Sequence, residues 1–93
     1  MIVGTLRIKL YAPWVHSLKE KRMELKSIIA RTENRFKVAI AEVDAQDVHQ
    51  TMVLGIACVT QNTAMADSVL DKVMEFIERN TEAEIVEVER EIR

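Results

Sequence analysis

The sequence of 93 residues predicts an α+β domain in which a four-stranded antiparallel sheet carries two helices on one face. Two observations support this fold class. Four stretches are typical of strands, by alternation or by β-branched content, and two longer stretches repeat apolar residues with the period of amphipathic helices. They follow one another as strand, helix, strand, strand, helix, strand. A chain of this length is expected to form one domain, residues 1–93.

The first strand is predicted over residues 2–11, where apolar residues recur at alternate positions. The only proline follows and breaks this pattern. Ser17 and Glu20 then have the spacing of a capping box, which predicts a helix from about residue 18 to residue 34. The apolar face of this helix is expected to contain Leu18, Leu25, Ile28, Ile29 and Thr32.

Two strands are predicted in the middle of the chain, over residues 38–43 and 51–59. Asn62 is suited to cap a second helix. That helix has a continuous apolar stripe, made of Ala66, Val69, Leu70, Val73, Met74, Phe76 and Ile77. The last strand, residues 83–92, is heavily charged between its apolar residues, which suits the edge of a sheet.

This order predicts a ferredoxin-like βαββαβ sandwich, with one face of the sheet left without helices. The residues expected on that face are mostly small and apolar: Val3, Thr5, Ala39, Ala41, Val43, Val53, Ala57 and Val59. A solvated sheet face is normally polar, so we expect another copy to cover this one, in a homo-oligomer that packs sheet to sheet or edge to edge. The alternative is an apolar face that a monomer tolerates.

Charge is distributed unevenly along the chain. Residues 17–37 contain seven Lys or Arg and three acids, whereas residues 67–93 contain nine acids and four Lys or Arg. Within the first helix, Lys19, Arg22 and Lys26 form a basic stripe, with Lys21 nearby. The stripe lies near the helix N-terminus, where anions are favoured, and it predicts contact with RNA or nucleotide phosphates. The alternative is a solvated helix face.

The connection after the second strand is unusually rich in polar side chains. Asp44, Asp47 and His49 could supply ligands to a divalent ion, although their spacing fits no established metal signature. Alternatively, the two aspartates bond to the backbone of their own turn. Gln46 and Gln50 could then serve the hairpin or a partner. We predict no metal here. A purely structural turn is the first interpretation, and an interface or partner role for Asp44, Gln46, Asp47 and Gln50 is the second.

No catalytic residue and no cofactor is predicted. The single cysteine, Cys58, alternates with core residues and is expected to be a buried, inert thiol. No apolar run approaches the roughly 20 residues of a membrane span, and the N-terminal stretch has no signal-peptide pattern. We therefore expect a cytoplasmic protein with no membrane contact.

Three segments together carry a family resemblance: MIVGTLRIKL at the start, HSLKEKR at the first helix, and VAIAEVDAQDVHQTMVLGIA across the central hairpin. The chain resembles the YlxP-type family of small uncharacterised bacterial proteins nearly end to end. The resemblance implies a ferredoxin-like fold and genes that lie among those of translation and ribosome maturation. It implies no established activity, cofactor or catalytic residue. Its signature positions are here Lys19, Glu20, Lys21, Arg22, Asp44, Gln46, Asp47 and Gln50.

We therefore predict a non-enzymatic binding module that works near ribosome maturation or translation, with ribosomal RNA or a ribosome-assembly protein as its partner. Two alternatives stay open. One is a small metal-dependent enzyme that uses Asp44, Asp47 and His49. The other is a ligand-sensing oligomer that binds a small molecule between its sheets.

Overall fold

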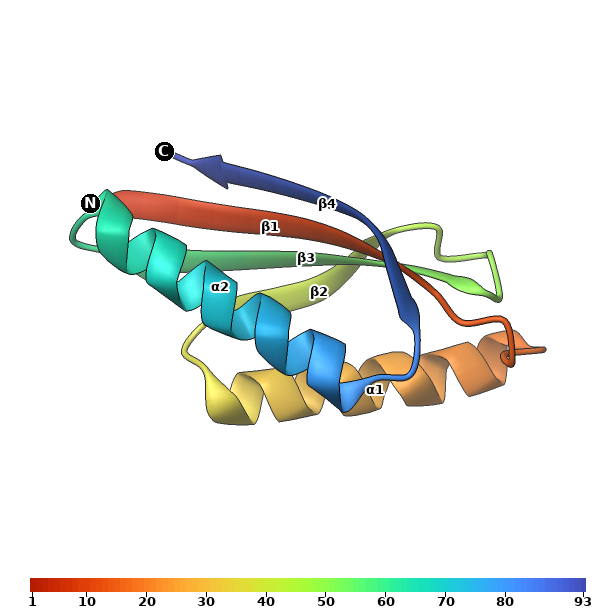
Figure 1. The fold of residues 1–93 in the computed structure, drawn as a ribbon. Coiled ribbons are helices and arrows are strands. Elements are labelled where there is room, and N and C mark those ends of the chain that lie inside the picture. The colour runs from red at the N-terminus through yellow and green to blue at the C-terminus, as the bar shows by residue number, and fades with distance from the viewer.

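The computed structural model describes residues 1–93. The elements follow the predicted order: β1 (Ile2–Tyr11), α1 (Leu18–Arg35), β2 (Ala39–Asp44), β3 (Thr51–Thr60), α2 (Thr63–Asn80) and β4 (Glu84–Ile92). Both helices lie on one face of the sheet, and the other face, called the open face below, has no helix (Figure 1). The predicted fold class is confirmed. None of the helices combines the length and the apolar character that crossing a lipid bilayer requires.

The four strands lie in the order β2-β3-β1-β4, and each is antiparallel to its neighbours. β1 and β3 form the centre and pair along their whole length, from Ile2 opposite Thr60 to Tyr11 opposite Thr51. β2 and β4 are therefore the two edges. Because β2 runs parallel to β1, and β4 runs against β1, the two edge strands run in opposite directions.

Side chains cap both helices where the sequence predicts. Ser17 Oγ accepts a hydrogen bond from the backbone amide of Glu20 at 3.1 Å, and the Glu20 carboxylate accepts one from the amide of His16 at 3.4 Å. Asn62 Oδ1 accepts from the amide of Met65 at 2.9 Å. Each cap satisfies a backbone donor that the helix leaves unpaired, a contribution of about 1 kcal/mol.

The core lies between the helices and the inner face of the sheet. It is formed by a cluster of 16 buried residues, to which β1 and β3 contribute Leu6, Ile8, Leu10, Met52, Leu54, Ile56 and Cys58. α2 buries Ala66, Leu70, Val73 and Ile77, as its stripe predicts. α1 buries Leu25 and Ile28 and, unexpectedly, Lys21. Burial of each large apolar side chain contributes roughly 1.5–3 kcal/mol.

A β-bulge at Val43 shapes the β2 edge. Glu42 lies opposite Leu54 and Asp44 lies opposite Val53, so Val43 has no partner on β3. The Val43 side chain instead lies over Gly55, where an added Cβ atom would be only 2.6 Å from Val43 Cγ1. Gly55 thus permits the bulged residue to fold against the open face.

Candidate functional site

Lys21 anchors the β2–β3 loop, residues 45–50, to the first helix. Its side chain is 1% exposed. The ammonium group donates hydrogen bonds to the backbone carbonyl oxygens of Ala45 and Val48, the latter at 2.7 Å. It also lies 2.9 Å from Glu42 Oε2. An ammonium group has three donors, and here three oxygens surround it.

This burial corrects the prediction that Lys21 contributes to a phosphate-contacting surface. The ammonium group points into the fold and is surrounded by oxygens of its own chain. Its contact with Glu42 is an ion pair without a well-aligned hydrogen bond, because Glu42 Oε2 accepts none. Burying a charge is costly unless it is paired, so the two residues depend on each other.

Asp44 shapes the start of the same loop. Its Oδ2 atom accepts a hydrogen bond from Arg7 Nη2 at 2.8 Å, and its Oδ1 atom accepts from the backbone amide of Ala45 at 2.7 Å. Ala45 has a φ of 56°, in the left-handed region that a residue with a side chain seldom adopts. Asp44 and Lys21 together hold this unfavourable backbone, one through the amide of Ala45 and one through its carbonyl.

The loop ends at Gln50, which is tied to the β1–α1 connection. The side-chain amide of Gln50 donates a hydrogen bond to the backbone carbonyl of Pro13 at 3.0 Å. The backbone carbonyl of Gln50 accepts one from the backbone amide of Ala12 at 2.8 Å. Gln46 and Asp47 differ, because both are exposed and neither side chain bonds to another group of the chain. Of the four residues assigned to a partner role, Asp44 and Gln50 thus hold the loop, while Gln46 and Asp47 are open to solvent.

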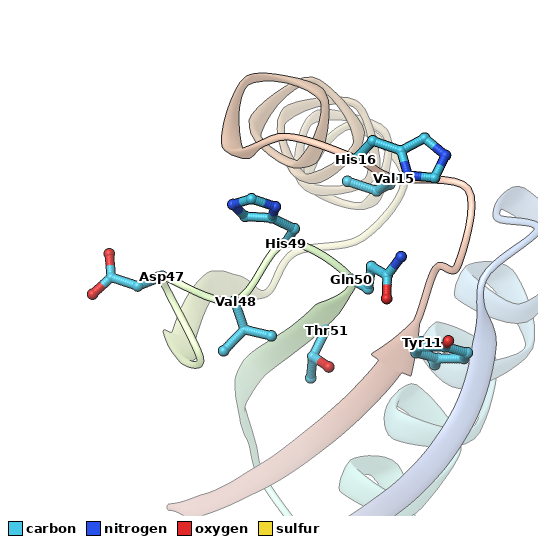
Figure 2. A pocket seen from close by; sticks show the side chains of 8 residues that line it. All are labelled: Tyr11, Val15, His16, Asp47, Val48, His49, Gln50 and Thr51. Atoms are coloured by element: carbon cyan, nitrogen blue, oxygen red, sulfur yellow. The ribbon is translucent and has the colours of Figure 1, made fainter.

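A hollow of about 600 Å³ lies between this loop and the β1–α1 connection, and both histidines line it. In Figure 2 the imidazoles of His16 and His49 point in different directions, and the Asp47 carboxylate points away from the other labelled side chains. No three His, Cys, Asp or Glu side chains lie close enough together to hold a metal ion. Asp44 is engaged by Arg7, so the proposed ligands Asp44, Asp47 and His49 do not converge.

The remaining basic residues of α1 form an exposed patch, called the basic surface below: Lys19, Arg22 and Lys26. None of them forms an ion pair within the chain, unlike Lys21 and Arg7. Arg22 and Lys26 border a hollow of about 500 Å³ at the β2 edge, with Leu25, Ile29 and Ala30 in its wall. The basic surface therefore lies beside the free edge of the sheet, next to apolar side chains.

The open face has an apolar half and a charged half. The strand register brings together Val3 with Val59, Thr5 with Ala57, and Ala57 with Ala39. A shallow apolar hollow of about 450 Å³ lies over this half, between Arg7 and Val43. The prediction that Val53 contributes to a contact on the open face is corrected. Val53 is only 2% exposed and lies among Lys9, Asp44, Ala45 and Val48, so it offers almost no surface to a partner.

The charged half of the open face was not predicted. Arg7 and Lys9 of β1 lie beside Glu89 and Glu87 of β4, and Glu91 continues the acidic row. Alternation along β4 places these acids on one face, but only the pairing with β1 decides which face it is. The predicted role of the open face in assembly stays a prediction.

Comparison with known proteins agrees with this architecture. The family model described as "Protein of unknown function (DUF503)" matches residues 3–90. The chain belongs to this family. It is 41% identical, over 68 residues, to the "Uncharacterized protein YlxP" of Bacillus subtilis (strain 168), a match that covers 73% of this chain and 74% of the relative. The predicted resemblance to YlxP-like proteins is confirmed.

A solved structure supports the fold independently of sequence. The de novo designed protein LFR1 1, with a ferredoxin fold, superposes with a TM-score of 0.65 at 16% identity, covering 100% of this chain and 86% of the design. At this level of identity the likeness concerns the fold alone. For this DUF503 protein, function must therefore be inferred from its surfaces.

Proposed function

We propose that this protein is a non-enzymatic binding module of ribosome maturation or translation, and that its basic surface contacts RNA phosphates. One observation carries the proposal: Lys19, Arg22 and Lys26 are exposed on one side of α1 and are unpaired within the chain. Lys19 also lies in the first turn of α1, at the positive end of the helix dipole, which favours anions. Unpaired cations can exchange their counterions for phosphates without first breaking an internal ion pair.

The open face supports a second contact, with a protein partner. Its apolar half is formed by small side chains, and the valines at its border, Val43 and Val59, are 52% and 68% exposed. A protein that covers this half would meet Arg7 and Lys9 and the acidic row of β4 at its border. A module with one RNA-facing surface and one protein-facing surface suits a factor that assists assembly of a ribonucleoprotein.

Charge reversal tests the RNA contact. In the triple variant Lys19→Glu, Arg22→Glu, Lys26→Glu, we expect weaker binding to fluorescently labelled fragments of ribosomal RNA, measured by anisotropy. Three lost phosphate contacts should reduce the slope of log Kobs against log salt by about 2, since each contributes roughly 0.7 on single strands. The loss should be similar for different RNA sequences, because phosphates are common to all of them.

A matched control changes the same net charge elsewhere. Lys37→Glu, Lys72→Glu, Arg79→Glu replaces three other exposed cations, none of which is ion-paired within the chain. Circular dichroism should show that both triple variants remain folded. Equal weakening by the two variants would mean that net charge, and not the basic surface, governs binding, and the proposal would be wrong.

A further inference from the structure

The charges of this protein are separated across the sheet as well as along the chain. The basic surface lies at the β2 edge, beside Glu33, Glu42 and the apolar wall of α1. At the opposite edge, Arg90 of β4 forms ion pairs with Asp67 and Asp71 of α2, at 3.2 and 2.7 Å. These ion pairs place the side of α2 that contains Asp67 and Asp71 next to β4. One lateral side of the molecule is thus basic and the other is acidic.

The acidic side extends along α2. Glu75 and Glu78 follow Asp71 by four and seven positions, so all three lie on the same side of the helix. We call Asp67, Asp71, Glu75 and Glu78 the acidic side. Burial lowers the pKa of Arg90, but hydrogen bonds from its guanidinium to Asp71 and Asp67 outweigh this, and its pKa is raised. A single arginine is therefore bound to two of the four carboxylates, and Glu75 and Glu78 have no partner within the chain.

Both edge strands have unpaired backbone groups that suit each other. β2 and β4 are antiparallel, so a second copy shifted sideways by the width of the sheet would present its β4 in antiparallel orientation to β2. The regular parts of the two strands also lie at the same level. Ala39 of β2 pairs with Ala57 of β3, and Ala57 pairs with Thr5 of β1. On the other side, Thr5 pairs with Glu91 of β4, so Ala39 and Glu91 lie at the same level of the sheet.

Charge favours this pairing over the symmetric ones. Two β2 edges brought together would place two basic surfaces side by side, and two β4 edges would oppose their acidic sides. When β4 of one copy instead pairs with β2 of the next, in a head-to-tail arrangement, the acidic side of the first copy meets Arg22 and Lys26 of the second. The contact then lies over the apolar wall of Leu25, Ile29 and Ala30. Exposed Val86 and Val88 of β4 supply apolar surface at the same edge.

We propose that the β2 edge and basic surface of one copy bind the β4 edge and acidic side of a second copy, so that copies join head to tail in a continuous sheet. Such a contact is heterologous and can be repeated, giving an open chain. The carboxylates of the second copy then pair with Arg22 and Lys26, two of the cations that are proposed to contact RNA. Self-assembly therefore competes with RNA, a consequence that rests on the proposed function, whereas the assembly itself does not.

Two complementary variants test the assembly. Arg22→Glu with Lys26→Glu reverses the basic surface, and Glu75→Lys with Glu78→Lys reverses the acidic side while leaving the Arg90 ion pairs intact. In sedimentation velocity without RNA, the wild type should grow in mean mass with concentration at low salt and return to monomer at high salt. Each variant alone should stay monomeric at low salt. An equimolar mixture of the two should assemble again, since every interface then pairs unlike charges.

A control and an RNA measurement complete the experiment. Lys72→Glu with Arg79→Glu should assemble at least as well as the wild type. A wild type that is monomeric at every concentration, or a mixture that stays monomeric, would overturn the assembly. In the RNA anisotropy assay, the Glu75→Lys, Glu78→Lys variant should bind at least as tightly as the wild type, and the Arg22→Glu, Lys26→Glu variant should bind more weakly.

The two proposals fail separately. Assembly without any RNA binding would refute the proposed function and leave the head-to-tail contact standing. RNA binding that requires Arg22 and Lys26, in a wild type that never assembles, would refute the contact and leave the RNA proposal standing.

Discussion

Lys21 shows how one buried charge can hold a loop in place. Its ammonium group reaches two carbonyl oxygens and one carboxylate across 21 to 27 positions of sequence. In Lys21→Met, the Glu42 carboxylate and two carbonyls lose their partner, and we expect the free energy of unfolding to fall by about 3 kcal/mol. Urea denaturation measures this. Lys19→Met, at an exposed position two residues earlier, should change it by less than about 0.5 kcal/mol.

The double variant Lys21→Met, Glu42→Leu separates the charge pair from the rest of the anchor. Removing both partners leaves no unpaired carboxylate near the core, so this variant should be more stable than Lys21→Met alone. If Lys21→Met were no worse than Lys19→Met, the anchor would contribute little to the fold.

At the scale of elements, the bulge on β2 and the glycine on β3 depend on each other. Gly55→Ala would place a methyl group against Val43, and we expect a loss of about 1–3 kcal/mol in the free energy of unfolding. Thermal denaturation of Val43→Ala, Gly55→Ala tests the cause, because the smaller residue at 43 should recover most of the loss. A double variant as unstable as Gly55→Ala alone would show that the contact is not the reason.

The elements themselves could be predicted because their signals are local. Ser17 and Asn62 cap the helices within three residues of their own positions, and the stripe of α2 repeats within the helix. The loop anchor could not be predicted, since it joins α1 to residues that only the fold brings near. A weak signal existed, because Lys21 lies one turn before Leu25 on the buried face. Val53 lies only three residues after the loop that ends at Gln50, but the sequence did not show that Ala45 and Val48 would lie over it.

At the scale of the whole molecule, the candidate site was predicted only in part. Lys19, Arg22 and Lys26 are exposed as expected, while Lys21 is internal. The uneven charge along the sequence was visible from composition, but its separation across the sheet depends on strand order. Because β2 and β4 occupy opposite edges, the basic first helix and the acidic last strand end up on opposite sides.

The most direct measurement is sedimentation of the tagged protein from native lysate through sucrose gradients at low and high salt, beside the Lys19→Glu, Arg22→Glu, Lys26→Glu variant. Binding of ribosomal RNA through the basic surface predicts that the wild type sediments with a ribosomal subunit at low salt and is released at high salt, while the variant stays at the top in both. A wild type that stays at the top in both gradients, or a variant that still sediments with the subunit, would contradict it.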